Sequence, residues 1–177
     1  MDTFIEQIVA VRKTPVQLLA QIMLWVLAVI LIVALLLLGP LLGQGMMTMI
    51  AVLGAFGVGY GAFRLSSNMS VEYEYSVTNE YFDLDRIVAR RKRKRALSVQ
   101  CKDFESFGRY NEAQHAHRNY DKRLIAGNPG DEAVWFATVR VKDLGFVLLV
   151  FQPDERVLNA IKKYLPRQVA HDAFRGQ

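Results

Sequence analysis

The 177-residue sequence contains a single cysteine, Cys101. One cysteine excludes an intramolecular disulfide, which fits a reducing compartment. The sequence also has no phosphate-cradling glycine loop and no paired cysteines at the spacing of a zinc site. These absences argue against disulfide-rich secreted domains, P-loop enzymes and zinc modules, and we expect no cofactor.

Charge is absent from two long apolar runs. Residues 16–38 and 46–64 contain no Asp, Glu, Lys, Arg or His before Arg64, which closes the second run. About 20 apolar residues span the hydrocarbon core of a bilayer, and Gly39-Pro40 is expected to break the helix between the runs. We therefore predict a transmembrane helical hairpin over residues 16–65. The lack of ionisable side chains within it argues against an ion or proton pathway.

The charges that flank these runs set the predicted orientation. Arg12 and Lys13 precede the first run, Arg64 ends the second, and the loop from Gly39 to Gly45 carries no charge. The positive-inside rule therefore places both termini in the cytoplasm, as in a multi-pass protein of the inner cell membrane. A cleaved signal peptide is the competing interpretation, but the first run is longer than the ~7–15 residues of a signal-peptide core.

The second run is rich in small residues. The glycines within it are Gly54, Gly57, Gly59 and Gly61. Small residues on a helix face allow close approach of another helix, so we expect these glycines to pack helices together. The partner is either the first helix of the same hairpin or a helix of a second copy.

Residues 1–15 have a pattern that fits a short helix at the membrane interface. The apolar residues on its expected face are Phe4, Ile5, Ile8 and Val9. A frayed start of the first membrane helix is the alternative. Thr14 and Pro15 are suited to the N-cap and first position of that helix, and residues 66–70 are expected to form a short linker after the second.

Residues 71–166 have the patterns of a small antiparallel β barrel or sandwich. Val71 to Val77 alternates apolar and polar residues, as a half-buried strand does. Further strands are expected at residues 81–89, 97–101, 123–126, 133–141 and 145–151. Residues 103–118 are expected to form a short helical turn or loop. An amphipathic helix from Pro153 to Leu165 closes the domain, and residues 167–177 form a tail.

This order of elements resembles the pleckstrin-homology (PH) superfold. The stretch Tyr73-Glu74-Tyr75-Ser76-Val77-Thr78-Asn79, then Phe82-Asp83-Leu84-Asp85 and a basic hairpin, is similar to the opening of bacterial PH-like domains, which often lie beside two membrane helices. The resemblance covers residues 71–166 and the helical hairpin. It implies an α+β membrane protein with a PH-like domain and a binding or scaffolding role, with no reaction attached.

One stretch of ten residues concentrates positive charge. It holds Arg86, Arg90, Arg91, Lys92, Arg93, Lys94 and Arg95. Anionic headgroups attract such a cluster by about 1 kcal/mol per cation near the surface, so the predicted contact is anionic lipid or an acidic partner. A solvated charge run that reinforces the topology is the alternative. Nucleic acid is not an expected partner, because the run lacks interleaved aromatic residues and the chain is expected to be anchored in a membrane.

Other reactive side chains form weaker patterns. His115 and His117 are too few ligands to predict a metal site. Cys101 falls on the apolar side of its strand, as a core residue does, and nothing in the sequence ties it to His115 as a nucleophile pair. Asp83 and Asp85 share a strand face, and we expect them to pair with the nearby cations.

Together these patterns predict a membrane-anchored, non-enzymatic binding or scaffolding module. The alternative is an accessory subunit of a larger membrane complex, with the glycine face of the second helix and the apolar strand Gly145–Phe151 as its interfaces. An enzyme that uses the region of Cys101, His115 and His117 ranks behind both.

Overall fold

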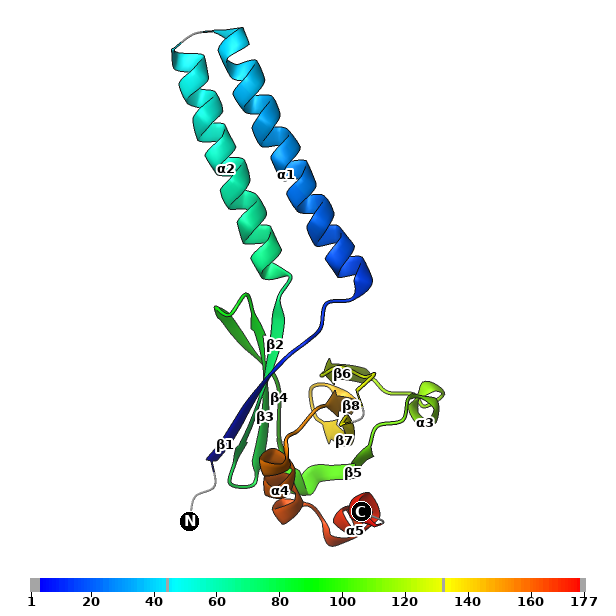
Figure 1. Cartoon of the computed structure of the whole chain (residues 1–177). Helices are drawn as coiled ribbons and strands as arrows, with labels where there is room; N and C mark the ends of the chain where they lie inside the picture. Colours follow the sequence, from blue (N-terminus) through cyan, green and yellow to red (C-terminus); the bar gives the residue numbers. More distant parts are fainter. Residues whose placement is uncertain (1–3, 44, 132, 176–177) are drawn as a thin grey trace. The chain divides into compact units, whose positions relative to one another are not determined.

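The computed structural model describes residues 4–43, 45–131 and 133–175. The chain divides into two compact units. One is a helical hairpin, residues 13–70, and the other is a β domain, residues 1–12 and 71–177. In chain order, the helical hairpin is therefore an insertion between the first two strands of the β domain (Figure 1).

The helical hairpin consists of α1 (Pro15–Leu42) and α2 (Met46–Asn68). Thr14 caps α1, because its side chain accepts a hydrogen bond from Gln17 N and its own N–H donates to the Gln17 side chain. Thr14 and Pro15 thus have their predicted roles. Both helices are long and apolar enough to cross a membrane.

The helix ends differ from the predicted ones. α1 continues through Gly39-Pro40 to Leu42 instead of ending at residue 38. A proline this close to the C-terminus of a helix removes one backbone hydrogen bond, and the loss leaves the turns before it intact. α2 runs to Asn68, so Met69 and Ser70 alone replace the predicted linker over residues 66–70.

Small residues and a polar pair join α1 to α2. The buried residues of the two helices are small: Ala28, Gly39, Ala51, Ala55, Ala62 and Ser66. A Cβ added to Gly39 would lie 2.3 Å from the Ala51 Cβ, so this approach requires glycine. Gln21 Nε2 donates to Ser66 Oγ at 2.7 Å, and Lys13 Nζ donates to Gln21 Oε1 at 2.6 Å. These bonds tie the start of α1 to the end of α2.

The β domain contains two four-stranded sheets. Sheet A has the order β1-β2-β3-β4, and sheet B has the order β5-β7-β8-β6. The strands are β1 (Phe4–Ala10), β2 (Val71–Thr78), β3 (Tyr81–Val88), β4 (Lys92–Gln100), β5 (Phe104–Arg109), β6 (Lys122–Ala126), β7 (Trp135–Val141) and β8 (Gly145–Phe151). The prediction left a barrel and a sandwich open. In the part of the chain that the structure describes, the two sheets do not close into a barrel, and the fold class is α+β.

Strand β1 replaces the predicted interfacial helix over residues 1–15. It pairs antiparallel with β2, from Phe4 opposite Thr78 to Ala10 opposite Glu72. Alternate residues of β1 face the core, as in a strand. The apolar positions in this short segment fit a helical period as well as a strand period, and the pairing with β2 settles the structure. Residues 1–3 of the predicted helix lie outside the described residues.

Sheet B also differs from the prediction. The expected β7–β8 hairpin is present and antiparallel, but β6 pairs with β8 in parallel. β8 lies between β6 and β7 in the sheet, although β6 and β7 are neighbours in the chain. β6 therefore runs in the same direction as β8 and opposite to β7. Residues 103–118, predicted as a turn or loop, form β5 and a short helix, α3 (Glu112–Ala116), capped by Asn111.

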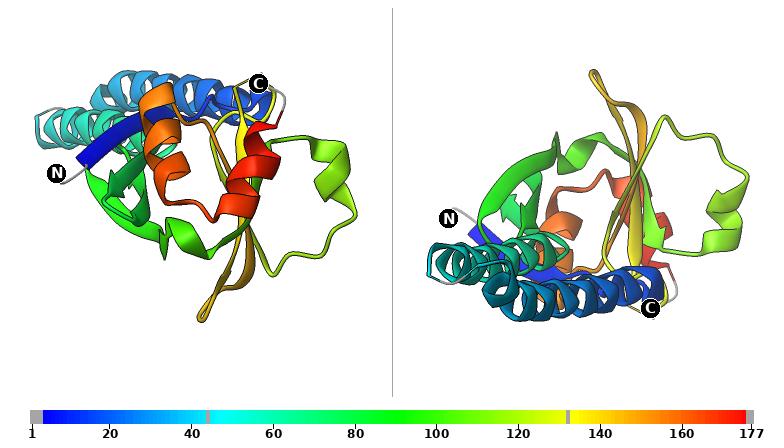
Figure 2. Two further views of the ribbon diagram at one scale, coloured as in Figure 1. Left: turned by 90° about the horizontal axis from the view of Figure 1, so that it is seen from below. Right: turned by 90° about the horizontal axis from the view of Figure 1, so that it is seen from above.

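Two helices follow the strands. α4 (Glu155–Tyr164) is the predicted amphipathic helix, and the Asp154 side chain caps it by accepting from Val157 N at 2.8 Å. The predicted tail is instead a second helix, α5 (Arg167–Phe174), which packs its apolar face on the core. Figure 2 shows α4 in orange followed by α5 in red; α4 packs on β1 and β2, and α5 packs on β5. Residues 176–177 of the predicted tail lie outside the described residues.

Aromatic side chains fill the space between the sheets. The Phe151 ring of sheet B lies 5.6 Å from the Tyr75 ring and 5.5 Å from the Phe82 ring of sheet A. The Tyr75 hydroxyl donates to the Ala126 carbonyl and accepts from Gln152 N. Tyr75 therefore joins the two sheets through both packing and hydrogen bonds.

Candidate functional site

The seven clustered cations lie on the β3–β4 hairpin, which we call the basic hairpin (Arg86 and residues 90–95). Arg86 is on β3, Arg90 and Arg91 are in the turn, and residues 92–95 begin β4. Ala89 and Arg90 both have φ of 54°, the left-handed region in which a tight hairpin turn is formed. All seven side chains are exposed, so the turn presents them to solvent.

Three of the seven cations are paired with carboxylates of sheet A. Arg90 Nε lies 2.8 Å from the Glu72 carboxylate, and Arg93 Nη2 lies 2.5 Å from the Glu74 carboxylate. Arg95 contacts Asp83 at 3.1 Å and Asp85 at 2.9 Å. The predicted pairing of Asp83 and Asp85 with nearby cations is confirmed. The density of positive charge in the sequence therefore overstates the charge that the hairpin presents.

Four cations remain without such a partner. Within residues 4–43, 45–131 and 133–175, no carboxylate pairs with them. They are Arg86, Arg91, Lys92 and Lys94. This unpaired set is the part of the basic hairpin that is free to bind an anion.

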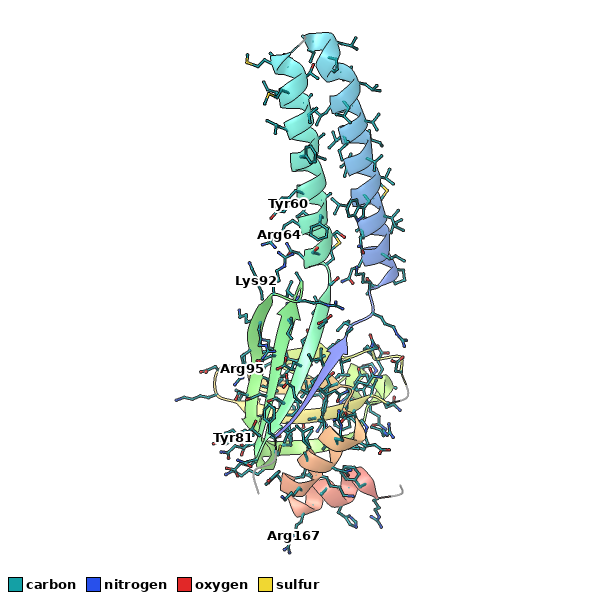
Figure 3. The ribbon with its side chains drawn as sticks, turned by 60° about the vertical axis from the view of Figure 1, so that its left-hand side comes forward. Tyr60, Arg64, Tyr81, Lys92, Arg95 and Arg167 are labelled. Atoms are coloured by element: carbon teal, nitrogen blue, oxygen red, sulfur yellow. The ribbon has the colours of Figure 1, made fainter. Side chains whose placement is uncertain are left out.

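The basic hairpin lies at the end of sheet A where both connections to the helical hairpin leave. Ala10, the last residue of β1, lies opposite Glu72. Val71, the first residue of β2, lies opposite Val88, which in turn lies opposite Lys92. Neighbouring strands are about 4.8 Å apart, so Lys92 lies about 10 Å from Val71. Figure 3 shows Lys92 at one end of the sheet and Tyr81 at the other.

Buried acidic groups on the outer face of sheet A hold the paired arginines. Glu74 is 4% exposed and Asp85 is 8% exposed. Burial, and then a hydrogen bond with Glu6, raises the pKa of Glu74, although the charge of Arg93 opposes the rise. These carboxylates need Arg93 and Arg95 as partners, so the paired arginines have a structural role.

The structure does not bring Cys101 and His115 together. Cys101 is fully buried in the core between the sheets, and burial raises the pKa of its thiol to about 12. His115 instead contacts Phe136, which packs with Leu148 in a separate cluster on the opposite face of sheet B. A nucleophile pair is therefore not formed.

His115 belongs to an aromatic cluster that the sequence analysis missed. Its ring stacks on Tyr110 and its Nδ1 lies 2.7 Å from the Tyr120 hydroxyl. Burial, and then the charges of Arg118 and Arg123, lowers the pKa of His115. His117 is exposed, and no group of three metal-binding side chains occurs in the described residues. The aromatic residues scattered through the polar segment 103–118 are the one feature of the sequence that indicates packing there.

The four predicted helix-packing glycines separate into two pairs. A Cβ at Gly54 would lie 3.5 Å from Leu35, and a Cβ at Gly59 would lie 3.9 Å from Ile32, so both face α1. A Cβ at Gly57 or Gly61 would meet no atom within 4 Å among the described residues. The first pair contacts side chains of α1, and the second pair has open space where side chains would lie.

Two β-sheets with helices packed after the last strand, in the order seen here, define the class of PH-like domains. Comparison with known families agrees, because the sequence matches Bacterial PH-like domain (DUF6106) over residues 1–171. The chain belongs to this family. No curated protein and no solved structure matches it. The match includes the N-terminal strand and the helical hairpin as well as the predicted domain at residues 71–166.

Proposed function

We propose that this protein is a membrane-anchored, non-enzymatic binding or scaffolding module whose basic hairpin contacts anionic lipid. α1 and α2 form its transmembrane hairpin in the inner cell membrane. Arg12, Lys13 and Arg64 flank the apolar runs, and the positive-inside rule then puts the β domain and both termini in the cytoplasm.

The observation that carries this proposal is the position of the unpaired cations. They lie at the end of sheet A where β1 ends and β2 begins, and the chain enters and leaves the helical hairpin at these two points. Between α2 and β2 the chain has two residues, Met69 and Ser70, at a reach of at most ~3.6 Å per residue. This covalent link, added to the ~10 Å between Val71 and Lys92, is short enough for lysine and arginine side chains to reach headgroups.

The chemistry of the β domain supports binding in preference to catalysis. Cys101 has the burial and raised pKa of an inert core thiol. His115 is enclosed by aromatic rings and lies apart from Cys101. The exposed, unpaired groups of the basic hairpin are cations, which suit electrostatic contact with phosphates.

The proposal is tested by replacing the helical hairpin with a short loop. Val11 N donates to Val71 O at 3.1 Å, so a short Gly/Ser linker can join Arg12 to Val71 in place of residues 13–70. This hairpin-deleted protein keeps β1, which a fragment that starts after α2 would lose. Its flotation is measured with phosphatidylcholine vesicles and with vesicles that also contain phosphatidylglycerol, at low and at physiological salt.

Two triple variants with the same change in charge isolate the contact. Arg91→Gln/Lys92→Gln/Lys94→Gln removes unpaired cations, and Arg90→Gln/Arg93→Gln/Arg95→Gln removes paired ones. We expect the first variant to weaken binding to anionic vesicles by about 100-fold and the second by less than about tenfold. Equal losses would show that net charge alone acts, and the absence of wild-type flotation at physiological salt would refute the lipid contact.

A second candidate function is that of a subunit of a larger membrane complex. Gly57 and Gly61 favour it, because they are four residues apart on α2 and have open space around them. In this case the protein would copurify with a membrane partner from mild detergent. Gly57→Leu/Gly61→Leu would abolish the copurification, whereas Gly54→Leu/Gly59→Leu would disturb the hairpin itself.

A further inference from the structure

A second concentration of positive charge lies in a groove between α4 and α5, which has a volume of about 470 Å³. Its lining residues are Lys162, Lys163, Leu165, Arg167, Ala170, His171, Phe174 and Arg175. We call it the α4–α5 groove. The groove is open to solvent.

Among the described residues, the Lys and Arg side chains of the groove are not paired with carboxylates, whereas the lining His171 contacts Asp172 at 3.5 Å. Four of its lining residues are Lys or Arg, and none is Asp or Glu. Within the described parts of the chain, no carboxylate pairs with Lys162, Lys163, Arg167 or Arg175. The negative end of the α4 dipole favours the two lysines in its last turn. It does not account for the two arginines, which lie at the start of α5 and just after it.

Aromatic rings hold the lysines of the groove. Lys162 Nζ lies 4.4 Å from the centre of the Phe174 ring, and Lys163 Nζ lies 5.3 Å from the centre of the Tyr164 ring. Phe174 is itself packed on Trp135, at 5.3 Å between ring centres. The floor is therefore apolar and anchored in the core, and the cations surround it.

The groove and the basic hairpin lie at opposite ends of the β domain, measured along β2. Tyr164, at the end of α4, lines a surface pocket together with Asn79 and Tyr81 of the β2–β3 turn. β2 has eight residues, so this turn lies about 23 Å along the sheet from Val71. Figure 3 shows Arg167 at the end that bears Tyr81, away from Lys92. A ligand of the groove is thus independent of the basic hairpin.

These observations define the charge and size of the ligand. Several unpaired cations around an open groove favour a ligand with more than one negative charge, because each added charge on the ligand adds a Coulomb attraction. Guanidinium groups match the oxygen geometry of phosphate, and ammonium groups add point charges. We infer that the α4–α5 groove binds a soluble, multiply charged phosphate compound, so that the β domain has a second anion site distinct from the basic hairpin.

The test uses the full chain in nanodiscs of neutral lipid, with inorganic pyrophosphate as the probe in isothermal titration calorimetry. Wild type is expected to bind one pyrophosphate per chain. Lys163→Gln/Arg167→Gln removes two exposed cations of the groove. We expect this variant to weaken binding about tenfold or more. Lys102→Gln/Lys142→Gln is the matched control, because it removes two exposed cations outside both the groove and the basic hairpin, and its affinity is expected to stay within about twofold of wild type.

Several results would overturn the inference. One is a wild-type titration without saturable binding, and another is an equal loss of affinity in the two variants, which would indicate attraction by net charge alone. Hexaglutamate tests an acidic peptide as the occupant. If it binds through Lys163 and Arg167 while pyrophosphate does not, the groove is a protein-docking site. Nanodiscs with phosphatidylglycerol test a lipid source, and competition by the lipid that needs Lys163 and Arg167 would also refute a soluble ligand.

Discussion

Two regions of the β domain, the basic hairpin and the α4–α5 groove, carry similar positive charge but differ in how that charge is paired. In the basic hairpin, carboxylates of β2 and β3 lie beside the cations, and they pair with Arg90, Arg93 and Arg95. In the α4–α5 groove, Lys162, Lys163, Arg167 and Arg175 line an open surface, and no Asp or Glu is among its lining residues in the described part of the chain. The dense basic run of the β3–β4 hairpin is thus partly neutralised by ion pairs. The four cations of the groove, spread over 14 residues of sequence, come together with no carboxylate partner among the described residues.

The difference follows from the elements that carry the charges. Strands align residues with cross-strand partners about 5 Å away, so acidic residues on β3 meet basic residues on β4 directly. α4 and α5 are joined by two residues and bring their cationic sides together around Phe174. Charge pairing in this protein is therefore set by the strand register and by the packing of helices, and the count of charges in a sequence window does not reveal it.

The largest effect on stability and on pyrophosphate binding is expected from replacing Phe174, whose ring forms the floor of the groove. Phe174→Ala removes ring contacts with Phe107 and Trp135, as well as the ring under Lys162. Because Phe174 is partly buried, the expected loss of stability is about 2 kcal/mol, measured by urea unfolding of the hairpin-deleted protein. Pyrophosphate binding should be lost, and binding to anionic vesicles should persist.

Phe174→Leu is the control for this prediction, since leucine keeps an apolar contact and removes the ring. It should be intermediate in stability. If Phe174→Ala were to weaken vesicle binding as much as pyrophosphate binding, the groove and the basic hairpin would not be independent.

A smaller effect is expected when the paired arginines are removed. Arg90→Gln/Arg93→Gln/Arg95→Gln leaves the buried carboxylates Glu74 and Asp85 without their partners, so stability should fall by about 1–2 kcal/mol. Arg91→Gln/Lys92→Gln/Lys94→Gln removes the same charge from exposed, unpaired positions and should change stability by less than about 0.5 kcal/mol. The free energy of unfolding of both variants is measured by urea denaturation. Equal destabilisation would mean that the ion pairs add nothing to the fold.

The smallest effect is the pH dependence that comes from Glu74. Its pKa is raised by burial and by Glu6, so the folded state binds this proton more tightly than the unfolded state does. The contribution of Glu74 to stability should therefore decline as the pH rises from 4.5 through its raised pKa. Glu74→Gln should remove this slope from the unfolding free energy, and Glu6→Gln should reduce it. Persistence of the full slope in Glu74→Gln would assign it to another group.

Long, regular patterns were predicted well from the sequence. The apolar runs predicted both helices, and Thr14-Pro15 predicted the N-cap of the first. The alternation of apolar and polar residues over Val71–Val77 predicted β2, and the turn residues predicted the β7–β8 hairpin. These features depend on residues close in sequence, and the hydrophobic period of a helix or a strand predicts how such residues are arranged.

Short segments were predicted poorly because their partners are remote in sequence. β1 was expected to be a helix, and its strand partner follows an insertion of 58 residues. The sequence predicts a tail where α5 forms, because the contact of Phe174 with Trp135 of sheet B is remote in sequence. A segment of eight residues or fewer has no stable structure by itself, so the tertiary partner determines its form.

The candidate sites divide in the same way. The sequence by itself determined that two helices are apolar enough to span a membrane, that cations gather between residues 86 and 95, and that the chain resembles bacterial PH-like domains. Only the tertiary structure decided which of those cations are paired, at which end of sheet A they lie, and that four others meet in the α4–α5 groove. The physical reason is that hydrophobicity and charge are properties of residues, whereas pairing and convergence depend on contacts between residues that only the folded chain brings together.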